Sequence, residues 1–200
     1  MRALFIGAHT DEEICFAGTM QNYSKKFYVA FSTCGHPELK KEFDASCDLL
    51  DVNSVASTLT VRAFNRQAVA DFLYEQQSGF DCLFTHSVND VHRDHRIVAE
   101  ESIRVWKKSL FTFMAPWNGN EEPNYFVEIT GQQLEKKIKA IKCYKSQSHR
   151  HYMNEDFIRS WARYNGGKIG KLYAEAFKLV RGIEFADICS VDRKCKRMNI

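Results

Sequence analysis

An α/β fold is the architecture that this sequence predicts, with a Rossmann-like, mostly parallel sheet and helices on both of its faces. Its 200 residues are 44% hydrophobic and 26% charged, which is typical of a globular chain. Across residues 1–116, apolar runs alternate with segments whose apolar residues recur at helical spacing. Alternation of this kind indicates parallel strands joined by crossover helices, because a parallel neighbour can only be reached by crossing a face of the sheet.

The first expected strand, Arg2–Ala8, is a nearly unbroken apolar run, as in strands that are buried on both faces. The third expected strand, Val55–Val61, is rich in β-branched residues, which favour extended backbone. Four further strands complete the expected core, at Phe27–Thr33, Val55–Val61, Cys82–Thr85 and Leu110–Ala115. In the doubly wound strand order 3-2-1-4-5, the first strand lies in the middle of the sheet beside the fourth.

Helices are expected between these strands. A polar, carboxylate-rich segment opens the first, at residues 12–24. Pro37 can begin the second, because the N–H that proline lacks has no partner at a helix start. The third helix is expected around Val69, Phe72 and Leu73, and the fourth at His92–Trp106.

Residues 117–200 are less regular, and we expect them to form a C-terminal α/β extension that shapes the site. The core at 1–116 and this extension would then make a single domain, 1–200. Leu134, Ile138 and Ile141 recur at the spacing of an amphipathic helix. The other expected elements are a loop at Trp117–Pro123, a strand at Tyr125–Ile129, a polar loop at Ser146–His151, a helix at Phe157–Tyr164 and a strand at Ala174–Val180.

Composition excludes several classes of protein. The net charge of +3, from 28 basic and 25 acidic residues, is too weak and too dispersed to indicate a nucleic-acid partner. No stretch approaches the roughly 20 apolar residues of a membrane span, and the N-terminal apolar run is too short for a secretory signal. The seven cysteines form no CxxC pair and are expected to be reduced thiols. We therefore expect a cytoplasmic protein, and the sequence leaves a homo-oligomer open.

Two clusters of ionisable residues follow the expected first and fourth strands. His9, Asp11, Glu12 and Glu13 come directly after the first strand, and His92-Arg93-Asp94-His95, preceded by Asp90, follows the fourth. Ligands of open parallel sheets bind outside the carboxyl ends of the strands. If strands one and four are neighbours, the two clusters face each other there.

The residue types in these clusters match a catalytic metal site. His9 and Glu12 are three apart at a helix start, as are His92 and His95, so each pair can face one point. Two imidazoles and a carboxylate with an open fourth position describe catalytic zinc. Asp11 is placed to take a proton from water, and a further imidazole can stabilise an oxyanion. Either Asp94 or Asp90 can fix the tautomer of a ligand histidine.

The same residues resemble a known family. Ala8–Glu13 (AHTDEE) is similar to the AHPDDE signature, and His92–His95 (HRDH) to the HxDH signature, of the PIG-L/LmbE-like de-N-acetylases. Segments at Cys143–Gln147 and Ala174–Phe177 resemble the C-terminal half of that family. Members are zinc hydrolases with a Rossmann-like fold that remove acetyl groups from N-acetylglucosamine units on varied carriers.

The resemblance implies a role for each matching residue. It implies His9, Glu12 and His95 as ligands of Zn²⁺, with Fe²⁺ as the alternative metal. It implies Asp11 as general base and His92 as the oxyanion-stabilising residue. Asp94 would orient a histidine, with Glu13 and Asp90 in support. Two positions depart from the signature: Thr10 stands for proline, and Glu12 stands for the ligand aspartate, which leaves Glu13 open as the ligand instead.

The expected partner is a small N-acetylated sugar or glycoconjugate, with no nucleic acid. The expected reaction is hydrolysis of its acetamide, which yields acetate and a free amino sugar. Two alternatives remain open: an amide hydrolase of a non-sugar metabolite, and a non-catalytic member that binds metal or sugar. Arg66 is the candidate substrate-binding residue, and further candidates are Trp117, His149 and Tyr173.

Overall fold

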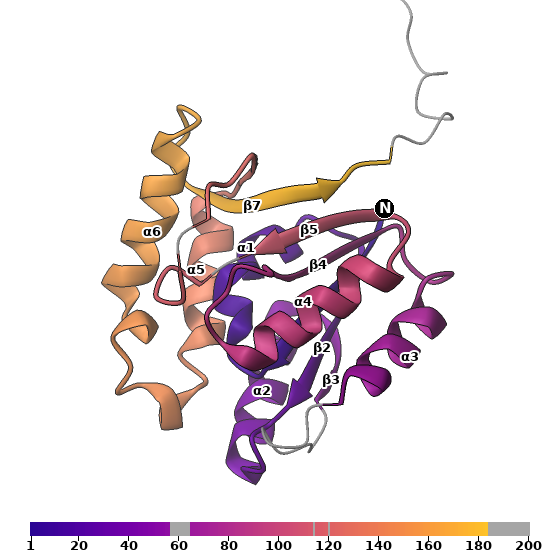
Figure 1. Cartoon of the computed structure of the whole chain (residues 1–200). Coiled ribbons are helices and arrows are strands. Elements are labelled where there is room, and N and C mark those ends of the chain that lie inside the picture. The colour runs from indigo at the N-terminus through magenta and orange to yellow at the C-terminus, as the bar shows by residue number, and fades with distance from the viewer. Residues whose placement is uncertain (57–64, 114, 120, 184–200) are drawn as a thin grey trace, which may run out of the picture.

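A seven-stranded sheet, in the order β3-β2-β1-β4-β5-β7-β6, forms the centre of the molecule (Figure 1). The computed structural model describes residues 1–56, 65–113, 115–119 and 121–183. The strands are β1 (Arg2–His9), β2 (Lys25–Ser32), β3 (Asn53–Ala56), β4 (Cys82–His86), β5 (Ser109–Phe113), β6 (Tyr125–Glu128) and β7 (Ala174–Arg181). The α/β fold class is confirmed, and so is the predicted order 3-2-1-4-5 of the first five strands.

The first five strands are parallel to one another, whereas β7 is antiparallel to both of its neighbours, β5 and β6. β1 pairs with β2 along almost its whole length, from Arg2 opposite Lys25 to His9 opposite Ser32. On its other side β1 pairs with β4, where Phe5 lies opposite Phe84. The C-terminal segment extends the same sheet, because β7 pairs with β5 and β6 pairs with β7.

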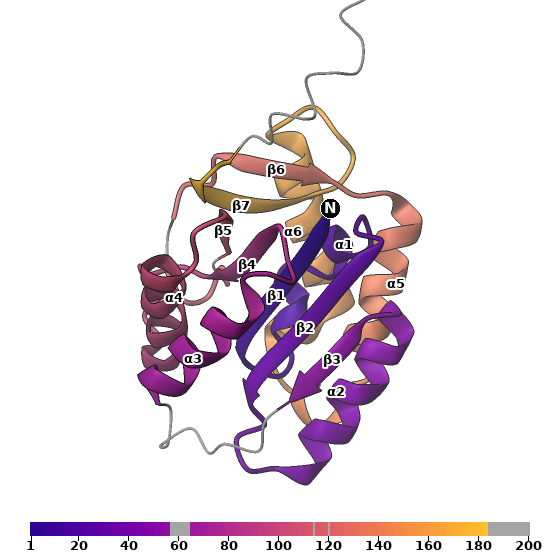
Figure 2. The same ribbon diagram turned by 90° about the vertical axis from the view of Figure 1, so that its right-hand side faces the viewer.

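Helices cover both faces of the sheet, as Figure 2 shows. α3 and α4 pack together on one face, and α2 and α5 pack together on the other. The helices are α1 (Ala17–Met20), α2 (Pro37–Leu50), α3 (Arg66–Gln76), α4 (Arg93–Val105), α5 (Gly131–Ile141) and α6 (Glu155–Gly167), with 3₁₀ turns η1 (Glu12–Cys15), η3 (Lys145–Gln147) and η4 (His151–Met153).

Two apolar cores result from this arrangement, one on each face. Leu4 and Ile6 of β1 belong to the core beneath α3 and α4, and Phe5 between them belongs to the core on the opposite face. Successive side chains of a strand point to opposite faces, so an unbroken apolar run is what a doubly covered strand requires. Burial of these side chains holds the carboxyl ends of β1 and β4 in fixed positions.

The predicted helix at 12–24 is wrong as a single element. The chain instead forms the 3₁₀ turn η1 and the one-turn helix α1, interrupted by Phe16, whose backbone is not helical (φ −143°, ψ 2°). Asp11 precedes this segment in the left-handed region (φ 78°). All residues of both short elements are buried. Close packing against the sheet decides the local backbone here, rather than helical spacing.

The other elements differ from expectation mainly at their ends. β3 begins at Asn53, two residues before the predicted strand, and the predicted part beyond Ala56 lies outside the described residues. The polar loop at 146–151 is flanked and partly formed by the 3₁₀ turns η3 and η4. α6 continues to Gly167, beyond its predicted end. None of the helices in the described part of the chain combines the length and the apolar character that crossing a bilayer requires.

Candidate metal centre

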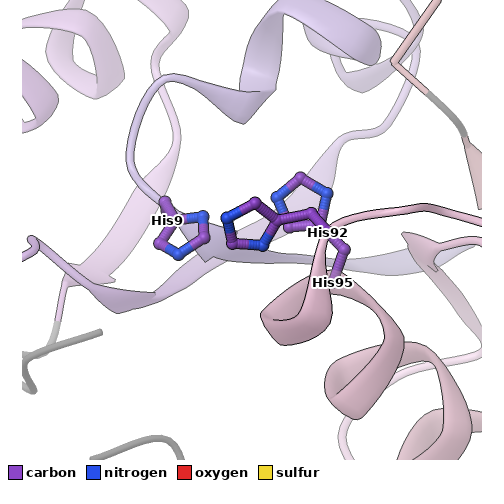
Figure 3. A group of neighbouring side chains, drawn as sticks. All are labelled: His9, His92 and His95. Atoms are coloured by element: carbon purple, nitrogen blue, oxygen red, sulfur yellow. The ribbon is translucent and has the colours of Figure 1, made fainter. Parts of the chain in front are cut away.

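The two ionisable clusters meet at the carboxyl edge of the sheet. His9 is the last residue of β1, His92 caps the N-terminus of α4, and His95 lies in the first turn of that helix. Their rings lie close together (Figure 3), with centroid separations of 4.9 Å for His9 and His92 and 4.4 Å for His92 and His95. Residues more than 80 positions apart in sequence therefore form one site, because β1 and β4 are neighbours.

The carboxylate of Glu12 lies at the centre of this group. Its Oε1 atom is 3.1 Å from Nδ1 of His9 and 2.9 Å from Nε2 of His95. Its Oε2 atom is 2.6 Å from Nε2 of His86, the last residue of β4. Burial acts to raise the pKa of Glu12, but the neighbouring imidazoles outweigh burial and hold that pKa well below its usual value. Glu12 is therefore a buried anion surrounded by the nitrogen atoms of three histidines.

The histidines differ in their response to this carboxylate. Burial acts to lower the pKa of His9, but hydrogen bonds with Asp94 and Glu12 raise it to about 9. Burial likewise opposes the charged form of His95, but the charge of Glu12 and the bond to Asp90 raise its pKa to about 10. For His86, burial prevails and lowers the pKa to about 4. Without a metal, protons on His9 and His95 balance the buried negative charge.

Two aspartates hold the outer nitrogens of the candidate ligand histidines. Oδ2 of Asp90 lies 2.8 Å from Nδ1 of His95, and Oδ2 of Asp94 lies 3.1 Å from Nε2 of His9. Both rings thus present the opposite nitrogen to Glu12. A carboxylate on the far side of an imidazole fixes its tautomer and orientation. The sequence left open which aspartate does this, and in the structure each aspartate contacts a different ring.

Glu13 does not join this group. Its carboxylate accepts hydrogen bonds from Ser46 Oγ (2.5 Å) and Tyr28 OH (3.3 Å), and the side chain is fully buried. Burial raises the pKa of its carboxyl, although these hydrogen bonds oppose the shift. Of the two neighbouring glutamates, Glu12 is the one that meets the histidines.

A close approach at Gly7 accommodates Glu12. A Cβ atom at position 7 would lie 2.5 Å from Oε2 of Glu12 and 2.9 Å from the carbonyl oxygen of His9. Glutamate is one methylene longer than the aspartate of the resembling signature. The space beside the bare backbone of Gly7 receives the end of this longer side chain.

The donor atoms fit a divalent metal. Within the described residues, two groups of three donors lie within 4.8 Å of one another: His9, His92 and His95, and Glu12, His86 and His95. Neither group is the predicted set His9, Glu12 and His95, whose members are connected through Oε1 of Glu12. Nε2 of His86 faces Glu12, whereas Nδ1 of this buried ring has no hydrogen-bond partner among the described residues. Imidazole and carboxylate ligands suit Zn²⁺ and Fe²⁺.

A cavity of about 310 Å³ opens beside these donors. Of the residues predicted from sequence, His9, Asp11, Glu12, His92, His95 and Trp117 line it. Asp11 is held there by its left-handed backbone. Burial, with the charges of Glu12 and Glu13, raises the pKa of Asp11 to about 8, while the charge of Arg150 acts to lower it.

Three residues predicted to hold substrate do not line this cavity. Arg66 begins α3 and pairs with Glu100 (2.6 Å) and Glu101 (3.3 Å) of α4. His149 is exposed and contacts the carbonyl oxygen of Ser146 through Nδ1. Tyr173 packs against the guanidinium of Arg163 on α6, whose Cζ atom lies 5.9 Å from the centre of the tyrosine ring.

Among the lining residues that sequence reasoning missed are His86, Asn118, Arg150 and Tyr152. A signal existed for His86, because it ends β4 just as His9 ends the neighbouring β1. Asn118 lies in the loop after β5, where its Nδ2 atom contacts Oδ2 of Asp90 at 3.4 Å. Arg150 and Tyr152 come from the C-terminal segment, and nothing in their local sequence indicates that they reach this edge of the sheet.

The architecture and the site together define an α/β protein with a histidine- and carboxylate-lined cavity at the carboxyl ends of its parallel strands. Its sequence matches no protein-family model and no curated protein sequence. Its fold, however, resembles several solved structures.

One is the conserved protein TT1542 from Thermus thermophilus, which is 16% identical with a TM-score of 0.79 over 94% of this chain and 98% of that chain. The zinc-inhibited form of teicoplanin deacetylase Orf2 is 15% identical, with a TM-score of 0.71 over 88% of this chain and 97% of its own. The A40926 pseudoaglycone deacetylase Dbv21 is 14% identical, with a TM-score of 0.67 over 92% and 99%. The chain thus has the fold of these deacetylases.

Proposed function

We propose that this protein is a metal-dependent N-deacetylase of the PIG-L/LmbE-like family. It would remove the acetyl group of an N-acetylated amino sugar, or of a conjugate of such a sugar, and release acetate. One observation carries the proposal: His9, Glu12 and His95 converge beside Asp11 and His92 in a single cavity. The motif resemblance and the shared fold with deacetylases support the same assignment.

His9, Glu12 and His95 would hold the metal, with Asp94 and Asp90 keeping the two imidazoles in the tautomers that face it. When bound, Zn²⁺ supplies two general effects: it polarises carbonyl groups, and it lowers the pKa of water to roughly 7. Metal would also replace the protons that His9 and His95 carry beside Glu12. The binding equilibrium should therefore release protons and weaken as pH falls.

Asp11 would act as the general base. Its carboxylate faces the cavity beside the metal ligands, where it can accept a proton from the attacking water and return it to the leaving amine. Its pKa is raised by burial and by neighbouring carboxylates, so the group holds a proton more readily than an exposed aspartate. A nearby cation would counter this shift and keep the resting carboxylate ionised.

His92 would stabilise the developing oxyanion. Nδ1 of His92 accepts the backbone N–H of Asp94 at 3.2 Å, so in the neutral ring the proton sits on Nε2. Burial, with the charges of His95 and His9, lowers the pKa of His92 and favours this neutral form. A fixed N–H donor of this kind can stabilise the carbonyl oxygen as negative charge develops in the transition state.

The cavity indicates the size of the reacting part. Its volume of about 310 Å³ lies at the small end of the range of roughly 300–1,000 Å³ typical of ligand pockets. A single sugar ring with its acetamide suits such a volume better than a whole glycoconjugate. Any carrier would extend through the mouth of the cavity.

An acetate-release screen tests the proposal. Purified protein, stripped with a chelator and reloaded with one equivalent of Zn²⁺ or Fe²⁺, is assayed on N-acetylglucosamine glycosides and, in parallel, on N-acetyl amino acids. We expect metal-dependent acetate release from the sugars and little from the amino acids. Faster release from the amino acids would favour the non-sugar amide hydrolase. Stoichiometric metal binding without acetate release from any substrate would indicate a non-catalytic protein.

A further inference from the structure

The mouth of the cavity carries a guanidinium group that no acidic side chain neutralises. Arg150, in the loop between η3 and η4, lines the cavity together with Asp11 and His92. The residue is exposed, and among the described residues no carboxylate lies within 4.0 Å of its guanidinium. Arg66, Arg104 and Arg159, by contrast, are each engaged by glutamates.

Tyr152 holds this guanidinium from one side. Nη1 of Arg150 donates a hydrogen bond to the phenolic oxygen of Tyr152, and its Cζ atom lies 5.8 Å from the centre of the Tyr152 ring. Tyr152 in turn stacks on Trp117, with ring centres 3.7 Å apart and planes 8° apart. The aromatic pair thus gives the arginine a rigid support. An arginine carries five N–H donors, so most of them are left for a ligand.

The surrounding charges make a substrate anion the natural partner. On the inner wall, the carboxylate of Glu12 is already paired with imidazoles of His9 and His95. The guanidinium of Arg150 at the mouth has no such ionic partner among the described residues, so an anion is best placed there. Arg150 and Asp11 line the same cavity. An anionic substituent held by Arg150 at the mouth would leave the neutral acetamide directed inward, toward Asp11 and His92.

We propose that Arg150 forms an anion subsite, and that the substrate is an N-acetylated amino sugar bearing a carboxylate or a phosphate next to the reacting ring. This inference rests on the proposed deacetylase function and specifies its substrate class. The planar fork of a guanidinium binds either oxyanion through paired hydrogen bonds. Arg150 is thus a specificity-determining residue, supplied by the C-terminal segment to a site whose chemistry comes from β1, β4 and α4.

Binding to a variant that does not turn over tests the subsite apart from catalysis. Metal-loaded Asp11→Asn protein is titrated calorimetrically with N-acetylglucosamine, its 1-phosphate, its 6-phosphate and its 3-O-lactyl ether. The phosphate and carboxylate arms distinguish the two sources of charge. We expect at least one acidic ligand to bind about 10- to 100-fold more tightly than the neutral sugar, as for one charge-assisted contact.

The preference should depend on Arg150 alone. In the Arg150→Gln background the preference for acidic ligands should disappear, and Arg150→Lys should retain part of it. Arg163 is the matched control, because its Cζ atom lies 5.9 Å from the centre of the Tyr173 ring but the residue does not line the cavity. Arg163→Gln should leave the preference intact. Thermal unfolding and metal content report whether each variant is folded.

Several outcomes would overturn the subsite. One is the absence of preference for any acidic ligand; another is a preference that persists in Arg150→Gln. A third is an equal loss of kcat/KM for acidic and neutral sugars in Arg150→Gln, which would mean that the arginine only tunes Asp11. Acetate release without acid preference would leave the deacetylase standing and the subsite refuted. Arg150-dependent binding of acidic ligands without acetate release from any substrate would refute the deacetylase and leave the anion subsite standing.

Discussion

Nε2 of His86 lies 2.6 Å from Oε2 of Glu12 and 3.0 Å from the backbone nitrogen of Ala8, so one buried ring contacts both the central carboxylate and β1. The other oxygen, Oε1, faces His9 and His95. His86 also stacks on His95, with ring centres 3.9 Å apart. A buried imidazole at the end of β4 therefore orients both a candidate carboxylate ligand and a candidate histidine ligand.

We expect His86→Ala to weaken zinc binding by about 10- to 100-fold, the usual cost of losing an outer partner of a metal ligand. Competition with a chromophoric chelator measures the zinc Kd directly. His149→Ala is the control, because His149 is exposed and outside the cavity. An unchanged zinc Kd in His86→Ala would remove the positioning role assigned to this residue.

Gly7 gives a second, independent test of the same carboxylate. A methyl group at position 7 would meet Oε2 of Glu12 at 2.5 Å, so Gly7→Ala should displace the carboxylate and weaken zinc binding. The double variant Gly7→Ala/Glu12→Asp should recover part of the affinity, because the shorter side chain ends before the new methyl group. Recovery distinguishes a local clash from general damage to β1. Equal zinc affinities in Gly7→Ala and the unaltered protein would contradict the argument.

Asp11→Asn should abolish most activity while preserving metal binding. Loss of a general base typically costs about 10²- to 10⁴-fold in rate, and asparagine tolerates the left-handed backbone that Asp11 adopts at φ 78°. The measurements are kcat for acetate release and zinc content on the same sample. Full activity in Asp11→Asn would exclude Asp11 as the base, and loss of zinc would instead place it among the ligands.

A buried ion pair outside the site should dominate local stability. Lys137 Nζ lies 2.6 Å from Oε1 of Glu175, and both side chains are almost fully buried. The same carboxylate accepts the backbone N–H groups of Gly18 (2.9 Å) and Thr19 (2.6 Å) in α1. Lys137→Ala leaves Glu175 charged and unpaired, so we expect a loss of about 3–5 kcal/mol in the free energy of unfolding.

The exposed pair Lys40–Asp44 on α2 is the control for this prediction. Its atoms also lie 2.6 Å apart, but both side chains are about half exposed. Lys40→Ala should cost about 0.5 kcal/mol or less. Urea denaturation followed by circular dichroism compares the two variants. Equal losses would show that burial does not control the contribution of the Lys137 pair.

Sequence reasoning predicts the sheet well. Helices cover both faces of each central strand, so the strand must be apolar on both sides and appears in the sequence as an unbroken apolar run. The same reasoning fails at residues 12–24, where the first nine residues are all buried and no glycine or proline stands at Phe16 to mark the break. The meeting of His9 with His92 follows from strand order, which the α/β pattern predicts. The contribution of Arg150 does not follow from strand order, because its place in the cavity depends on how the C-terminal segment packs.

His86 shows a different limit. A single histidine at the end of a strand usually has no functional meaning, and only the position of β4 beside β1 gives it one. The same holds for Asp90 and Asp94: their spacing indicates that either can orient a histidine, and only the packed structure shows that each contacts a different ring. Residue types thus predict the chemistry of this site, and tertiary contacts decide which residue contacts which candidate ligand.

A metal titration of acetate release tests the central claim most directly. Chelator-stripped protein is titrated with Zn²⁺ or Fe²⁺ while acetate release from an N-acetylglucosamine conjugate is followed, with the Glu12→Gln/His95→Ala variant in parallel. The account predicts no activity without metal, a rise that ends at one equivalent per chain, and no rise in the variant. Undiminished activity in the stripped protein, or equal activation of the variant, would contradict it.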